Sequence, residues 1–149
     1  MAQSFKREVI RTERAPKPAG VYSQAFKITG EGALLFMAGQ TSRDLVTGEI
    51  IHKGDVRAQT RQVLEHIKGI VETAGGTLQD LVKVTVLYRD VRDIPAVAEI
   101  RREYFPHEPP CSTGFGAILA DPDLLVEIEA TAVIGRSNEY DTSGGTRGI

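Results

Sequence analysis

Residues 56–74 constrain the fold more than any other part of the chain. Apolar and small residues recur there at steps of three and four, which places them along one side of an α-helix. Asp55 stands at the expected N-cap position, and Gly75 and Gly76 follow the last turn, so both ends of the helix carry their usual signals. A helix with one apolar side has to pack on another layer, which the rest of the chain must supply.

The remaining segments have mainly strand character. Residues 24–29 and 33–38 are short apolar runs separated by a Gly-Glu-Gly loop, which predicts a hairpin. Residues 81–88 are rich in β-branched side chains and predict a central strand. Two further strands are expected at residues 112–118 and 124–134, the first weakened by its glycines.

A second amphipathic helix is expected at residues 94–105, before Pro106. The order of elements is then strand, strand, helix, strand, helix, strand, strand. Because two helices can cover only one face of a sheet, this order predicts an α+β fold in which a mixed sheet carries both helices on one face. The other face needs a different partner.

The last expected strand indicates what that partner is. Its apolar residues alternate with Glu127, Glu129, Thr131 and Val133, so the apolar set faces the helices and the two carboxylates face the other way. A face that mixes polar and apolar side chains suits contact with further subunits. We therefore expect a homo-oligomer.

Composition narrows the class of protein. A chain of 149 residues suits one compact domain, expected at residues 1–136, with a mobile tail at residues 137–149. The 18 basic and 20 acidic residues form no run of like charge, so nucleic acid is not an expected partner. The single cysteine, the polar start of the chain and the lack of a long apolar run favour a cytoplasmic protein that does not enter a membrane.

Five segments occur in an order and spacing that resemble the reactive intermediate deaminase (Rid) family, the YjgF/YER057c/UK114 group. They are PAGVYSQAF (18–26), MAGQTSRDLVTGEI (37–50), GDVRAQTRQVLEHIKGIVETAGGTLQDLVKVTVLYRDV (54–91), YFPHEPP (104–110) and LLVEIEATAVI (124–134). The resemblance covers nearly the whole chain.

The resemblance implies a chorismate-mutase-like fold, assembled as a homotrimer around a central barrel, with clefts between subunits. It also implies hydrolysis of enamines and imines, such as 2-aminoacrylate, to a 2-oxo acid and ammonia, without a metal or organic cofactor. Glu127 matches the glutamate that positions the water and is the expected catalytic residue. Tyr22 matches a tyrosine that lines the cleft, and Gly39 falls where the backbone approaches the ligand.

The chain departs from the family at the turn that carries the carboxylate-binding arginine. The sequence there is Pro109-Pro110-Cys111-Ser112-Thr113, so Cys111 occupies the position of that arginine. A thiol offers neither the positive charge nor the paired N–H groups of a guanidinium. Cys111, Ser112 and Thr113 are nevertheless expected to bind the substrate, and the substrate is expected to have changed.

Three interpretations of Cys111 stay open. It is a small residue at a subunit contact, a residue that touches a different substrate, or a nucleophile with His107 as its base. An arginine from elsewhere in the chain also fits, and Arg43, Arg89 and Arg102 are the candidates.

The remaining site residues and the activity each allow a second interpretation. Glu127 and Glu129 also fit ordinary exposed carboxylates, Tyr22 fits a packed aromatic, and Gly114 and Gly116 fit either a close approach to a ligand or relief of crowding. A family member that only binds a small metabolite, and a specialised catabolic deaminase, compete with the imine hydrolase. A ribonuclease is disfavoured by the charge. The histidines show no metal-ligand spacing, so no metal site is expected.

Overall fold

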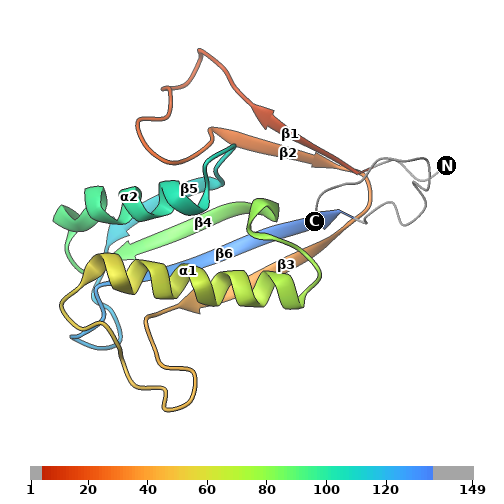
Figure 1. The fold of residues 1–149 in the computed structure, drawn as a ribbon. Helices are drawn as coiled ribbons and strands as arrows, with labels where there is room; N and C mark the ends of the chain where they lie inside the picture. The colour runs from red at the N-terminus through yellow and green to blue at the C-terminus, as the bar shows by residue number, and fades with distance from the viewer. Residues whose placement is uncertain (1–4, 136–149) are drawn as a thin grey trace.

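The computed structural model describes residues 5–135. Figure 1 shows two helices on one face of a four-stranded sheet, and a separate two-stranded ribbon that rises away from it. The strands are β1 (Lys6–Ile10), β2 (Ala25–Thr29), β3 (Gly32–Gln40), β4 (Leu81–Tyr88), β5 (Cys111–Gly116) and β6 (Val126–Gly135), and the helices are α1 (Val56–Thr73) and α2 (Ile94–Tyr104), with single turns of 3-10 helix at η1 (Leu78–Asp80) and η2 (Val91–Asp93). The predicted α+β class is confirmed, and the tail expected at 137–149 lies outside the described residues.

The sheet has the strand order β3-β6-β4-β5 and is mixed, as predicted. The β6 strand is antiparallel to both of its neighbours, whereas β5 runs parallel to β4. The chain between β4 and β5 contains α2, which provides the crossover that a parallel pair requires.

The core fills the space between the sheet and the helices. In α1 the buried positions follow the spacing seen in the sequence, and the Asp55 carboxylate caps the helix by accepting a hydrogen bond from the Ala58 N–H (3.0 Å). From the sheet, alternate residues of β4 and β6 point toward the helices, as the alternation predicts. The largest fully buried core side chains are Val63, Leu64, Ile67 and Val71 of α1, Leu81, Val84 and Val86 of β4, Val97 and Ile100 of α2, and Ile128 of β6.

The prediction that residues 24–29 and 33–38 form a hairpin is wrong. Both segments are strands, but β2 pairs with β1 and β3 pairs with β6, in two different sheets. The β3 strand pairs along most of its length with β6, a strand that contributes side chains to the core. Gly30 has a φ of 91°, which lets the chain turn away between β2 and β3. The strand β1 is missing from the sequence-based order because Lys-Arg-Glu-Val-Ile is too polar to stand out.

No helix within residues 5–135 combines the length and the apolar character needed to cross a bilayer.

Gly69 is the one position in α1 where a stabilising change is expected. It lies inside the helix, and a Cβ added there would meet nothing within 4 Å. Gly69→Ala is therefore expected to raise the free energy of unfolding by about 0.5–1 kcal/mol, because alanine restricts the unfolded chain without a steric cost. Chemical denaturation of the two proteins measures this difference, and a loss of stability would contradict the open surroundings of this residue.

Candidate active site

The face of the sheet opposite the helices carries the charged residues that the sequence singled out. Because side chains alternate along a strand, the register places Lys83, Thr85 and Leu87 of β4 on this face. Beside them lie Cys111, Thr113 and Phe115 of β5, and Glu127, Glu129 and Thr131 of β6. Leu34 and Phe36 of β3 lie on the same face and are 64% and 75% exposed, and Phe115 is 49% exposed. This uncovered face is amphipathic in the described chain.

Glu127 lies against the backbone of Gly39. It is the second residue of β6, half-buried, and its carboxylate extends over the neighbouring strand where the β3–β6 register shifts between Met37 and Gln40. A Cβ added to Gly39 would overlap the Glu127 carboxylate, so only glycine leaves room for this side chain. The structure thus brings together two residues that are far apart in the sequence.

Tyr22 and Cys111 are held near the other end of the uncovered face. The Ser23 N–H donates to the Pro110 carbonyl (3.3 Å), and the Ser23 hydroxyl donates to the Pro109 carbonyl. These two bonds tie the residue after Tyr22 to the residues before Cys111. The segment around Tyr22 and the start of β5 therefore form one hydrogen-bonded unit.

A buried arginine completes that unit. Arg101 of α2 is 5% exposed and donates to the Val21 carbonyl (3.0 Å), next to Tyr22. Burial lowers the pKa of Arg101, and the neighbouring Tyr88 offsets this effect in part. This bond restricts the backbone next to Tyr22, because losing it would leave a buried N–H donor of the guanidinium unpaired.

A groove opens beside Tyr22. Its volume is about 480 Å³, and it lies between the end of the β1–β2 ribbon and the turn that precedes β5. Its walls include Val9, Arg11, Lys17, Tyr22, Glu108 and Pro109. The groove combines cations and carboxylates with the ring of Tyr22, so it offers room and polar contacts for a small molecule.

The residues around Cys111 do not all face the same way. Cys111 and Thr113 lie on the uncovered face, where Thr113 accepts a hydrogen bond from the Lys83 ammonium (2.7 Å). Ser112 pairs with the buried Val84 and therefore lies on the helix-facing side, away from its two neighbours. Its expected role in binding, like those of Cys111 and Thr113, stays a prediction.

The structure separates some of the interpretations that the sequence left open. His107 is exposed, and no hydrogen bond within residues 5–135 joins it to Cys111, so nothing supports the pairing of a nucleophile with a base. A Cβ at Gly114 would come within 2.8 Å of the Tyr88 ring, which supports relief of crowding there. In the part of the chain that is described, no three His, Cys, Asp or Glu side chains gather as metal ligands would.

The arginine that interacts electrostatically with Cys111 is not one of the three candidates that the sequence offers. Arg43 binds the carbonyl of Gly48 in its own loop (2.9 Å), and Arg89 binds the carbonyl of Leu124 (2.7 Å) beyond the far end of the sheet. Arg7 of β1 instead reaches the start of β4, immediately before the pair formed by Lys83 and Cys111. The sequence held only a weak signal for it, because β1 itself was not recognised.

The two ends of the uncovered face are far apart within one chain. On β4, Cys111 is opposite Lys83 and Glu127 is opposite Leu87. Four residues separate these positions along the strand, about 13 Å, and the two flanking strands are about 10 Å apart. A small ligand cannot touch both residues of the same chain.

The fold and this arrangement define a two-layer α+β protein with a polar site on the open face of its sheet. The model of the family described as endoribonuclease L-PSP matches residues 12–134. The chain therefore belongs to this family, which confirms the resemblance to Rid proteins.

Individual relatives agree with this assignment. A RutC family protein of Pyrococcus horikoshii is 49% identical over 126 residues, which cover 85% of this chain and 97% of that protein. The protein named 2-iminobutanoate/2-iminopropanoate deaminase of Dermatophagoides farinae is 31% identical over 128 residues, 86% of this chain and 97% of the relative. The crystal structure of YyfB, a Rid family protein of unknown function from Yersinia pestis, aligns with a TM-score of 0.73 at 32% identity and covers 86% of this chain and 98% of that one.

Proposed function

We propose that this protein is a deaminase that hydrolyses 2-imino acids, and their enamine tautomers of the 2-aminoacrylate type, to 2-oxo acids and ammonia. The observation that carries the proposal is the Glu127 carboxylate, placed over Gly39 on the uncovered face. Membership of the family and the name of the Dermatophagoides relative support the same class of reaction.

The proposed reaction needs one proton-transfer group and a site that holds the water and the imine together. Water adds across the C=N bond, and Glu127 passes a proton from the water to the nitrogen, which yields a carbinolamine. A second proton moves from the new hydroxyl to the nitrogen, the C–N bond breaks and ammonia leaves. The carbon keeps the oxygen as the 2-oxo group. Holding the water and the imine carbon together is the main contribution of the site.

The proposed site forms between subunits of a homotrimer. The distance between Cys111 and Glu127 within one chain supports this, because a neighbouring chain can bring its own Cys111 and Tyr22 toward Glu127. The exposed apolar side chains Leu34, Phe36 and Phe115 surround the polar residues of the uncovered face and suit a contact between copies.

Phe36→Glu is expected to convert the trimer into monomers, because it would bury a carboxylate in an apolar contact. Sedimentation velocity should give about three times the mass of one chain for the wild type and about one chain mass for the variant. Lys68→Glu, a charge change on the exposed side of α1, is the control and should leave the assembly intact. A wild-type monomer would contradict the proposed assembly.

Imine hydrolysis is the test of the function. A dehydratase generates 2-aminoacrylate and 2-iminopropanoate, semicarbazide traps the imine that remains, and the protein competes with the trap. We expect less trapped imine and faster release of ammonia in the presence of the wild type. Binding of 2-oxo acids without any such acceleration would favour a protein that only binds a small metabolite. Acceleration confined to other amino-substituted substrates would favour a specialised catabolic deaminase.

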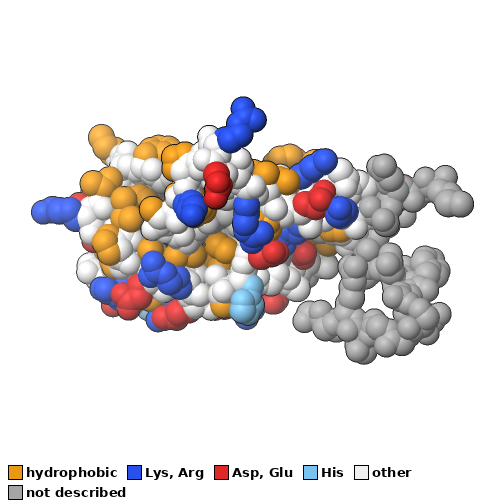
Figure 2. Space-filling view, turned by 90° about the horizontal axis from the view of Figure 1, so that it is seen from above, with side chains coloured by type: hydrophobic (Ala, Val, Ile, Leu, Met, Phe, Trp, Pro, Cys, Tyr) orange, Lys and Arg blue, Asp and Glu red, His pale blue; other side chains and the backbone are white. Residues whose placement is uncertain are grey.

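A ribonuclease, the activity named in the family description, finds no support on the face that Figure 2 presents. Figure 2 shows Lys and Arg side chains interspersed with Asp and Glu on the face that it presents, without a continuous basic patch. The formal net charge is −2. Binding to a phosphate backbone depends on such a patch, so salt-sensitive binding of RNA is not expected.

A further inference from the structure

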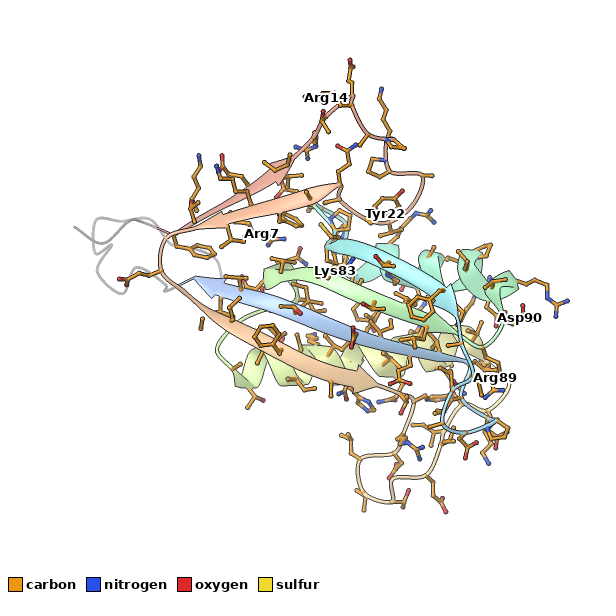
Figure 3. The ribbon with its side chains drawn as sticks, turned by 180° about the vertical axis from the view of Figure 1, so that it is seen from behind. Arg7, Arg14, Tyr22, Lys83, Arg89 and Asp90 are labelled. Atoms are coloured by element: carbon orange, nitrogen blue, oxygen red, sulfur yellow. The ribbon has the colours of Figure 1, made fainter. Side chains whose placement is uncertain are left out.

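Arg7 of β1 makes a hydrogen bond to the start of β4, which is 74 residues away in the sequence. Figure 3 shows it between the β1–β2 ribbon and the sheet, on the same side as Lys83. Its guanidinium donates to the Leu81 carbonyl (3.2 Å) and to the Gln79 carbonyl, and it stacks on the ring of Phe26 with 4.3 Å between the guanidinium carbon and the ring centroid. These contacts fix the guanidinium at the start of β4.

One nitrogen of this guanidinium is left without a partner among the described residues. The Nε of Arg7 is buried and makes no hydrogen bond within residues 5–135. A guanidinium has five N–H groups, and its bonds to Gln79 and Leu81 use one from each terminal nitrogen. Buried donors without partners are uncommon in proteins and call for an explanation. The Nε together with a terminal nitrogen is the fork that binds a carboxylate through two parallel hydrogen bonds.

Arg7 has no salt-bridge partner among the described residues, although the carboxylates of Asp80 and Glu108 lie close enough to act on its charge. Within residues 5–135, no carboxylate forms a salt bridge with Arg7 or with Lys83. Burial lowers the pKa of Arg7, and Asp80, Glu108 and Cys111 offset this effect in part. The Asp80 carboxylate already accepts the Thr77 N–H (2.8 Å), so it is engaged in its own turn.

Cys111 stands next to both cations. Lys83 is its direct partner in the β4–β5 register, and Arg7 binds the backbone of Leu81, two residues earlier on β4. Lys83 and Cys111 lie on the same face, and Thr113 fixes the Lys83 ammonium there. The position at which the sequence lacks an arginine therefore lies beside two cations from other strands.

We propose that Arg7, assisted by Lys83, binds the substrate carboxylate in place of the arginine that is missing at position 111. This inference rests on the proposed function, because it assigns the group that recognises the acid in the same site. It predicts that the substrate is an acid, and that the β1–β2 ribbon carries a specificity-determining residue. The thiol of Cys111 is shorter than the arginine side chain that it replaces, and it carries no positive charge of its own.

The test compares an acid with its amide, in binding rather than in turnover. Pyruvate and pyruvamide are titrated into ¹⁵N-labelled full-length protein, and the two affinities are read from the NMR shifts. The wild type should bind pyruvate at least about tenfold more tightly than pyruvamide, since a charged hydrogen-bonded pair contributes that much. Arg7→Met should remove this preference, and Lys83→Met should reduce it. Arg14 is exposed and is labelled in Figure 3. Arg14→Met makes the same charge change and should keep the preference for pyruvate.

Arg7→Lys is the second variant, and it serves as the test if Arg7→Met does not fold. It keeps the charge but loses the fork, so it should retain only part of the preference. A full preference in Arg7→Met or in a folded Arg7→Lys, or no preference in the wild type, overturns the inference. If the preference for pyruvate depends on Arg7 but the protein does not hydrolyse imines, the inference is supported and the proposed function is contradicted.

Discussion

Glu127→Gln is expected to lower the kcat of imine hydrolysis by about 10²–10⁴-fold, because the amide keeps the shape of the side chain but cannot accept a proton from water. Thermal unfolding should change little, since Glu127 is half-buried and makes no salt bridge among the described residues. The KM should change less than kcat, because the proposed role lies in the chemical step.

Glu129→Gln is the matched control for this change. Glu129 lies on the same strand and the same face, two residues further along, and is exposed. Its substitution should leave kcat within about twofold, as is usual for surface positions. Equal losses in the two variants would point to a general effect of charge on this face and against a specific role of Glu127.

Gly39→Ala is expected to reduce activity by about 10²-fold with only a small change in stability. The added Cβ would take the space of the Glu127 carboxylate, and this flexible side-chain end can rotate away without moving the backbone. The fold is then preserved while the proposed proton-transfer group is displaced, and a shift of about 1 Å suffices for such a loss.

A double-mutant comparison separates this mechanism from a general disturbance of β3. In the Glu127→Ala background, Gly39→Ala should cost little further activity, because both changes remove the same group from its place. Gly69→Ala, which adds the same methyl group where nothing is near, should leave activity unchanged. Additive losses in the double variant would mean that Gly39 acts independently of Glu127.

Local patterns in the sequence predict the layers well but predict strand partners poorly. The periodicity of α1 and the alternation on β6 are properties of single segments, and their predicted bounds fall within about two residues of the observed ones. The partner of β2 is instead decided by β1, a short strand of mostly polar residues that no local pattern marks. The predicted hairpin failed for this reason.

The same distinction applies to the candidate site. Glu127 could be picked out from a family motif, and its contact with Gly39 follows from one register shift in the sheet that sequence does not encode locally. Arg7 could not be picked out, because its position depends on hydrogen bonds to Gln79 and Leu81, more than seventy residues away. Long-range contacts of this kind are visible only in the folded chain.

The buried core cluster includes no residue before Met37 in the described part of the chain. The β1–β2 ribbon carries Arg7 and borders the groove beside Tyr22, and the side chains of Arg7 and Ser23 join this part of the chain to backbone carbonyls elsewhere. Carbonyl acceptors are present whatever the side chain, so the exposed positions of the ribbon can change while these two donors and the packing beneath the ribbon are kept. Within this family, substrate preference and thermal stability would then be free to diverge separately, the first through residues 6–24 and the second through the layer of helices.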